Sequence, residues 1–259
     1  MREVMMVAMM MMINGRKTNV VQMNPEGEKT IVMVHGLFTS LSVYYFAIAP
    51  RLAKKYHVVL YDLSGHGLSE AREEVLTPKN LSEDLVALMK QLNIEKACVV
   101  GYSFGGAVAL YTAVHHDLVE RLVLIDMPWL DEAEFSLSSD DDIDLKVEIE
   151  KHVQSTKIRI PDQVSKRTWI RLEKMFGDGK LTKTLVASHQ VLKALSITEL
   201  KIPTLLLYGK KSPYLETGKR LRTAVKDARL RIGRGDHNLP VQSALWVYWQ
   251  VRIFSNKHF

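Results

Sequence analysis

The sequence has little cysteine and no apolar run long enough to cross a bilayer, and both shortages narrow the class of protein. Cys98 is the single cysteine among 259 residues, so no disulfide can form within the chain and a reducing, cytoplasmic setting is expected. The apolar stretch from Val4 to Ile13 is too short for a membrane span. It lacks a small-residue cleavage site and leads into Asn14-Gly15, a hairpin turn signal. We therefore expect an edge hairpin rather than a signal peptide.

The net charge of +6 is unevenly distributed along the chain. Ten Lys or Arg residues lie between Lys201 and Arg234, whereas ten Asp or Glu residues lie between Asp126 and Glu150. The simplest interpretation is two solvated faces, or two parts of the protein that attract each other. The alternative is a docking patch for an anionic carrier such as coenzyme A or an acyl carrier protein. Nucleic acid is not expected as a partner, because the basic residues are not interleaved with aromatic ones and no binding motif is present.

Short β-branched runs alternate with longer helical patterns, which predicts an α/β protein with a mostly parallel central sheet and helices on both faces. A hydrophobic content of 47% is enough for a sizeable core. The predicted strands are short and apolar, as strands buried on both faces should be: Ile31–Val34, Val58–Tyr61, Ala97–Val100, Arg121–Ile125, Thr204–Tyr208 and Leu230–Ile232. The predicted helices lie between them: Ser42–Lys54, Lys79–Leu92, Gly105–His116, Tyr214–Val225 and Pro240–Ile253.

One interval interrupts this alternation. Between residues 128 and 200 the sequence has no convincing strand, only charged helical patterns such as Ile143–Val153 and Gln163–Met175. A structureless loop of that length would be improbable in a compact domain. We therefore expect an α/β core formed by residues 1–127 and 201–259, with residues 128–200 inserted as a helical cap.

A G-x-S-x-G motif covers residues 101–105, at the end of one predicted strand and the start of a helix. The glycines permit a tight strand-to-helix turn that lifts the Ser103 hydroxyl clear of the sheet. The helix N-terminus beneath it favours developing negative charge. In this context the motif predicts a nucleophilic serine rather than a glycine-rich turn.

A serine hydroxyl needs a base within hydrogen-bond reach, and imidazole has a suitable affinity for protons near neutral pH. Of the nine histidines, His237 lies in a glycine-rich loop directly after the last predicted strand and before the final helix. From that loop the imidazole can reach Ser103 across the carboxyl ends of the strands. The sequence has no H-E-x-x-H motif and no cysteine cluster, so neither a metal site nor a cofactor is expected.

An oxyanion hole needs two backbone N–H groups aimed at one point. Phe104, next after the nucleophile, can supply the first, and Leu37, in the loop after the first core strand, can supply the second. Phe38 and Tyr102 are then expected to border the substrate. His35, in the same loop, is interpreted as a structural histidine rather than a catalytic one.

The motifs V-H-G-L, Y-D-L-S-G-H-G-L-S, G-Y-S-F-G-G and G-D-H occur in this order and resemble the α/β-hydrolase family over nearly the whole chain. The likeness is greatest to small serine esterases and thioesterases with a helical cap. The resemblance implies a Ser, acid, His order and a substrate pocket between the core and the cap. A serine nucleophile argues against the dehalogenase and epoxide-hydrolase branches, which use an aspartate there.

The family's usual acid position is occupied here by Ser212, which cannot stabilise an imidazolium as a carboxylate does. Asp126, at the end of the preceding strand, occupies the other strand end from which family members supply the acid. We predict a Ser103, His237, Asp126 triad, with an acid-less dyad as the alternative. Asp236 is adjacent to His237 and is expected to point away from it.

These residues favour a serine hydrolase acting on an ester or thioester of a small acyl substrate, through an acyl-enzyme on Ser103. Acyl transfer is the same chemistry with water excluded. Two other classes remain open: a lyase or isomerase on the same scaffold, and a non-catalytic ligand receptor that retains the pocket. Side chains of the cap are expected to determine substrate specificity, and one sequence does not tell which of them point into the pocket.

Overall fold

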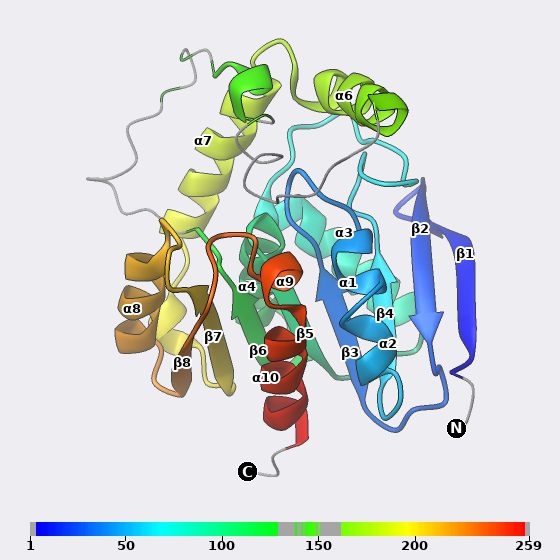
Figure 1. The fold of residues 1–259 in the computed structure, drawn as a ribbon, viewed down its shortest axis with the longest axis vertical. Coiled ribbons are helices and arrows are strands. Elements are labelled where there is room, and N and C mark those ends of the chain that lie inside the picture. The colour runs from blue at the N-terminus through cyan, green and yellow to red at the C-terminus, as the bar shows by residue number, and fades with distance from the viewer. Residues whose placement is uncertain are drawn as a thin grey trace.

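The computed structural model describes residues 4–128, 138, 141, 143–148, 150 and 162–256, and of residues 162–168 it describes the backbone alone. Its centre is an eight-stranded sheet in the order β1-β2-β4-β3-β5-β6-β7-β8 (Figure 1). The sheet is parallel from β4 to β8, and β1 and β2 are antiparallel. The strands are β1 (Met6–Ile13), β2 (Arg16–Met23), β3 (Thr30–Val34), β4 (His57–Tyr61), β5 (Ala97–Tyr102), β6 (Val119–Ile125), β7 (Thr204–Gly209) and β8 (Ala228–Gly233). All six predicted core strands are confirmed.

The first two strands form the expected edge hairpin. A two-residue turn joins them at Asn14 and Gly15, which both have positive φ, 46° and 78°. Such a turn matches the twist of the flanking strands and favours the Asn-Gly pair. β2 then pairs with β4, so the hairpin extends the parallel sheet at one edge.

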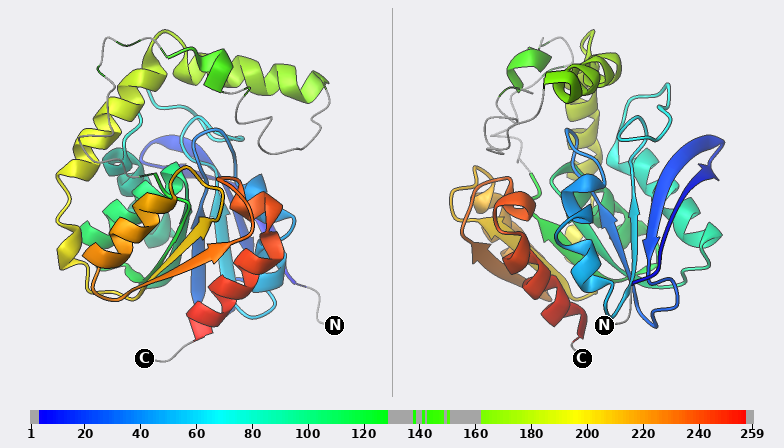
Figure 2. Two further views of the ribbon diagram at one scale, coloured as in Figure 1. Left: turned by 60° about the vertical axis from the view of Figure 1, so that its left-hand side comes forward. Right: turned by 45° about the vertical axis from the view of Figure 1, so that its right-hand side comes forward.

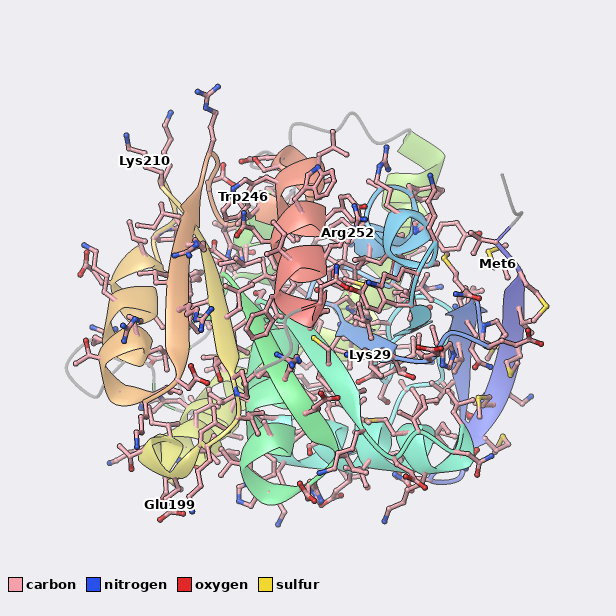
Figure 3. The ribbon with its side chains drawn as sticks, turned by 90° about the horizontal axis from the view of Figure 1, so that it is seen from below. Met6, Lys29, Glu199, Lys210, Trp246 and Arg252 are labelled. Atoms are coloured by element: carbon pink, nitrogen blue, oxygen red, sulfur yellow. The ribbon has the colours of Figure 1, made fainter. Side chains whose placement is uncertain are left out.

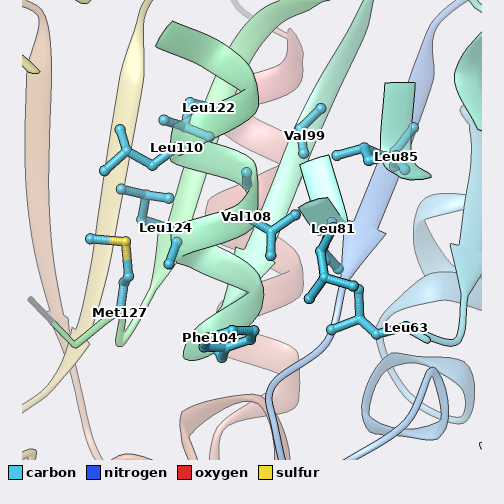
Figure 4. Close-up of a cluster of buried hydrophobic side chains, with 14 of the residues drawn as sticks. Leu63, Leu81, Leu85, Val99, Phe104, Val108, Leu110, Leu122, Leu124 and Met127 are labelled. Carbon is cyan, nitrogen blue, oxygen red and sulfur yellow. The ribbon is translucent and has the colours of Figure 1, made fainter. Parts of the chain in front are cut away.

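Helices cover both faces of the sheet, as predicted. One face carries α3 (Pro78–Gln91), α4 (Phe104–His115) and α8 (Leu215–Ala224). The other carries α1 (Ser42–Tyr45), α2 (Ala49–Leu52) and α10 (Ala244–Asn256), with the short α9 (Leu239–Gln242) above α10. Figure 4 shows part of the first of these layers, where Val108 of α4, Leu81 of α3 and Val99 of β5 belong to one buried apolar cluster. The protein therefore has two buried cores, one on each side of the sheet.

Two predicted helices are each interrupted in the structure. The predicted helix Ser42–Lys54 divides into α1 and α2, because Pro50 lies in the first turn of α2 and has no N–H to continue a preceding helix. The predicted helix Pro240–Ile253 divides at Ser243, whose φ of −134° is not helical. The hydroxyl of Ser243 donates instead to the Arg234 carbonyl.

The described part of the inserted segment is helical. α6 (Asp162–Phe176) covers the predicted Gln163–Met175, and α7 (Lys180–Lys193) follows it. Of the other predicted helix, residues 145–148 are helical, whereas residues 149 and 151–153 lie outside the described residues. Figures 1 and 2 show α6 and the start of α7 beyond the carboxyl ends of the parallel strands. Phe176 and Leu181 are buried in the same core as α3 and α4, so this segment is anchored to the body of the protein.

Candidate active site

Ser103 occupies the sharp turn between β5 and α4 in a strained backbone conformation. Its φ of 52° and ψ of −123° are unusual for a residue with a side chain. Two backbone hydrogen bonds hold it there: its N–H donates to the Ile125 carbonyl at 2.9 Å, and the Gly106 N–H donates to the Ser103 carbonyl at 2.8 Å. A Cβ at Gly101 would lie 2.3 Å from the Gly105 carbonyl oxygen, so only glycine fits there. The turn exposes the Ser103 hydroxyl at the carboxyl edge of the sheet.

His237 contacts Ser103 on one side and Asp126 on the other. The Nε2 atom lies 3.0 Å from Ser103 Oγ, and Nδ1 lies 3.1 Å from Asp126 Oδ2. With its proton on Nδ1, the imidazole donates to the carboxylate and its Nε2 accepts the serine hydroxyl. The three side chains come from three separate strand ends, as parallel topology allows. The structure thus brings together the three residues that the sequence analysis selects.

Asp126 is fully buried directly after β6, and three interactions keep it in position. Its backbone N–H donates to the Leu207 carbonyl at 2.8 Å, and its Oδ1 accepts the Gly209 N–H at 3.2 Å. Oδ2 faces His237. A buried carboxylate is costly unless its oxygens have partners. Here both oxygens are partnered, so the charge can be held at this depth.

Ser212, at the family's usual acid position, and Asp236, adjacent to His237, both direct their side-chain hydrogen bonds to other residues. Ser212 Oγ accepts the Tyr214 N–H at 3.0 Å, within its own turn. The Asp236 carboxylate accepts the Asn238 N–H at 2.8 Å and the Gln242 side-chain amide at 2.8 Å. Asp236 therefore points away from the imidazole, as expected.

Two tyrosine rings flank the imidazole of His237. The Tyr102 ring centroid is 5.3 Å away, and the Tyr214 ring packs edge-on at 4.9 Å. Burial raises the pKa of both phenols, so both stay neutral. The Tyr102 hydroxyl donates to Asn238 Oδ1 at 3.3 Å, so this residue supports the His237 loop as well as bordering the pocket. Tyr214 was not selected from the sequence, where it is one aromatic at the start of a helix.

The loop that contains Leu37 is held by buried histidines. His35 Nδ1 donates to the Gly36 carbonyl at 2.8 Å, and its Nε2 accepts the Leu63 N–H at 2.9 Å. Burial lowers the pKa of His35 well below its ordinary value, which keeps the ring in the neutral form that this pattern needs. His66, equally buried, hydrogen-bonds the Leu37 carbonyl. The histidine of the V-H-G-L motif thus has the structural position expected for it.

Asp62 ties the same loop to the segment after β4. Oδ1 accepts the Leu41 N–H at 2.9 Å, and Oδ2 accepts the Leu68 N–H at 2.9 Å. A Cβ at Gly67 would lie 1.9 Å from the carboxylate, so the chain there must pass close to it. The Y-D-L-S-G-H-G-L-S motif is explained by this carboxylate, which fixes two loops at once.

Leu37 and Phe104, the two residues predicted to supply backbone amides, both line the pocket above Ser103. Neither amide donates a hydrogen bond to another described residue. Phe104 is the first residue of α4, where an N–H has no partner within the helix. Both groups are thus available to a ligand atom beside Ser103.

A cavity of about 670 Å³ opens over Ser103 and His237, and apolar surface predominates in it. The α/β core contributes Ser103 and His237 to the lining, together with Phe38, Tyr214 and other residues. The inserted segment contributes five described residues: Pro128, Ile143, Glu148, Leu181 and Leu185. Sequence reasoning missed all five; for the leucines the reason is that an apolar residue facing a pocket has the same helical periodicity as one facing the core.

Within the described residues there is no group of three His, Cys, Asp or Glu side chains able to hold a metal ion. None of the described helices combines the length and the apolar character that a membrane crossing requires. What the described site offers is a hydroxyl, an imidazole, a buried carboxylate and two free amides. That set of groups suits acyl chemistry at Ser103.

Comparison with known sequences agrees with this geometry. Residues 29–144 match the family model described as the alpha/beta hydrolase fold. The chain is similar to Esterase YbfF of Escherichia coli (strain K12), with 36% identity over 109 residues, 42% of each chain. It is also similar to 3-oxoadipate enol-lactonase 1 of Acinetobacter baylyi, with 40% identity over 107 residues, 40% of each chain. The matches thus span about two fifths of the length of these curated relatives.

Comparison with solved structures extends the likeness to almost the full chain. The enol-lactonase from Burkholderia xenovorans LB400 superposes with a TM-score of 0.73 over 96% of this chain and 100% of its own, at 22% identity. At 22% identity, this likeness shows a shared fold. Strand order, the turn at Ser103 and the solved structures together show the α/β-hydrolase fold, and residues 29–144 match the family model described by that fold.

Proposed function

We propose that the protein is a serine hydrolase that cleaves esters of small acyl substrates. The observation that carries the proposal is the continuous chain of contacts from Asp126 through His237 to Ser103. A serine held 3.0 Å from a base, with the base oriented by a buried carboxylate, is the arrangement of an activated nucleophile. The esterase and enol-lactonase relatives support hydrolysis as the reaction class.

In the proposed reaction Ser103 Oγ attacks the substrate carbonyl carbon while its proton passes to His237 Nε2. The carbonyl oxygen becomes an oxyanion, which the N–H groups of Leu37 and Phe104 stabilise. The tetrahedral species collapses, and the leaving alkoxide takes the proton from His237. Water then attacks the acyl-enzyme by the same route, releasing the acid and restoring the serine. Asp126 stabilises the imidazolium in both halves.

The pocket lining favours a neutral, mainly apolar acyl group. Among the described lining residues Glu148, Asp236 and His237 are the ionisable groups other than tyrosine, and none is lysine or arginine. An acidic residue in the wall disfavours an anionic substrate by like-charge repulsion. Coenzyme A or an acyl carrier protein as carrier stays a prediction from the basic segment after residue 201, as do thioester cleavage and a cytoplasmic location.

The inserted segment, residues 128–200, is proposed to be a cap that shapes this pocket. Leu181 and Leu185 lie four residues apart on α7 and both border the cavity. Ile143 and Glu148 border it from the preceding part of the segment. Acyl transfer remains accessible to the same acyl-enzyme if the acceptor excludes water. No described contact favours a lyase, an isomerase or a receptor over a hydrolase.

The proposal predicts turnover of simple carboxylic esters that depends on Ser103. A series of 4-nitrophenyl esters of graded acyl length, with matching acyl thioesters, identifies the accepted class. Ser103→Ala should lower kcat/KM by at least about 10³-fold, because the nucleophile is lost while substrate binding remains. Rates within tenfold of the parent for the variant would overturn the proposal, and unchanged thermal unfolding serves as the folding control.

A second prediction separates the triad from a dyad. Asp126→Asn keeps the shape of the side chain but removes the charge that stabilises the imidazolium, so the acylation rate should fall about 10³ to 10⁴-fold. Ser212→Ala, the matched control, should be nearly silent because Ser212 contacts Tyr214 rather than His237. The dyad predicts the reverse: a mild effect at Asp126 and a gain for Ser212→Asp. Stopped-flow measurement of the acylation burst distinguishes the two patterns.

A third prediction concerns the cap. The Leu181→Ala, Leu185→Ala double variant should shift the preferred acyl length upward, because it enlarges the pocket by two side chains. The short-chain kcat/KM should fall mainly through KM, by about tenfold, the scale of one or two lost apolar contacts. The control Leu192→Ala removes an α7 side chain that is buried in the core and does not border the cavity. An unchanged acyl-length profile in the double variant would remove these residues from the substrate site.

A further inference from the structure

The outer face of α10 carries three large apolar side chains that the protein leaves exposed. Leu245, Trp249 and Ile253 follow one another at intervals of four residues and are 56%, 49% and 50% exposed. Side chains four residues apart lie along one face of a helix. The opposite face of α10 is buried against the sheet by three other side chains: Val247, Val251 and Phe254. We call the three exposed residues the α10 stripe.

Positive charge borders the α10 stripe on both sides. On one side α10 packs against α2, which bears the exposed Arg51. Lys54, also exposed, lies two residues beyond the end of α2. On the other side lies β8, where Arg231 is exposed and pairs with Leu207, whose side chain packs on the α10 side of the sheet. Figure 3 shows α10 with Arg252 and Trp246 on one layer, opposite the layer of α3 and α4.

The elements that border the stripe contain no acidic residue. From residue 29 to 61, from 228 to 235 and from 237 to 259 the sequence has no Asp or Glu. α10 itself has Arg252 as its charged residue, and its guanidinium lies 5.0 Å from the Trp249 ring centroid. A cation over an exposed indole combines an apolar ring with a charge that stays in water. The surface as a whole is apolar along its centre and cationic at its margins.

From this arrangement we propose that the α10 stripe and its cationic margins bind the surface of an anionic lipid bilayer. Helices of this composition lie in the plane of the interface, with Trp, Leu and Ile at the level between headgroups and acyl chains and Lys or Arg at the phosphates. α10 would lie along the bilayer, with Arg51, Lys54 and Arg231 over the negative headgroups.

The charge around the α10 stripe favours an anionic bilayer over a second copy of the chain as its binding partner. A two-fold contact through the stripe would bring the cations of one copy against those of the other, with no acidic residue in the bordering elements to compensate. An anionic surface supplies the opposite charge over the whole area. No residue of α10 borders the substrate cavity, so membrane binding would leave the pocket uncovered.

The test uses the full chain and sedimentation with lipid vesicles. Vesicles in which about a third of the lipid is phosphatidylserine should bind the protein, and pure phosphatidylcholine vesicles should bind it much more weakly. Binding should fall as salt is raised, because screening acts on the cationic margins. Absence of binding to the anionic vesicles, or equal binding to both kinds, would overturn the proposal.

Variants assign the binding to the stripe. The Trp249→Ser, Ile253→Ser pair should lower the partition coefficient at least about tenfold, since two insertable side chains are lost. The matched control is Met10→Ser, Met12→Ser on β1, where the side chains are similarly exposed, 49% and 54%. Equal binding by the two double variants would contradict the assignment, as would a dimer in solution that disappears with the stripe variant.

A fluorescence measurement keeps the test valid if the double variant folds poorly. Brominated lipid in the anionic vesicles should quench the tryptophan emission of the unaltered protein. Trp249→Phe keeps the apolar side chain and should remove most of that quenching. Quenching that persists in Trp249→Phe would place the contact elsewhere and overturn the proposal.

Discussion

The site depends on the backbone of one residue, Ser103, which is held at φ 52° between β5 and α4. A conformation of this kind costs of order 1 to 3 kcal/mol and persists only when its surroundings over-determine it. Here the surroundings are the Ile125 carbonyl of the next strand, the first turn of α4 and two glycines that allow strand and helix to touch. Strands β5 and β6 and helix α4 supply these together, so the position of the Ser103 hydroxyl is a product of the packed core rather than of a local loop.

The same sheet edge accounts for the position of Asp126, the proposed acid. Asp126 follows β6, which lies between the serine strand β5 and β7, so its carboxylate rises beside His237 from the middle of the sheet. Ser212, at the position where the resemblance places the usual acid, directs its hydroxyl to the Tyr214 N–H within its own turn. The two strand ends are neighbours, and a carboxylate at either can face the same imidazole nitrogen. Relocation of the acid therefore requires no change in the positions of Ser103 or His237.

Much of this architecture can be predicted from the sequence, because strands buried on both faces are continuous apolar runs and Asn14-Gly15 is a specific turn signal. The interruption of the predicted helix Ser42–Lys54 could not be predicted from periodicity. Tyr44, Ile48 and Leu52 keep a spacing of four residues and are all buried, so the apolar pattern runs unbroken across the gap. Pro50, in the interior of the predicted helix, was the available signal for a break, because proline has no N–H to continue a helix.

The site likewise has residues that the sequence predicts and residues that it does not. Ser103, His237 and Asp126 could be selected because each has a strand end before it and a chemical task that few residue types perform. The walls could not, since Leu181 belongs to the buried core as well as bordering the cavity, and Leu185 has the helical spacing of a core leucine. Tyr214 acts by packing against the imidazole, and one aromatic at the start of a helix leaves no pattern in a single sequence. His66 lies inside the Y-D-L-S-G-H-G-L-S motif, but the motif alone does not reveal its hydrogen bonds to the Ser64 and Leu37 carbonyls.

The central claim is that Ser103 is an activated nucleophile, and covalent capture tests it most directly. Incubation with a fluorophosphonate followed by intact-protein and peptide mass spectrometry should give one adduct, on Ser103. Labelling should be slowed strongly in His237→Ala, which leaves the hydroxyl in place but removes its base. Absence of an adduct on the folded protein, or labelling as fast in His237→Ala as in the parent, would contradict the account.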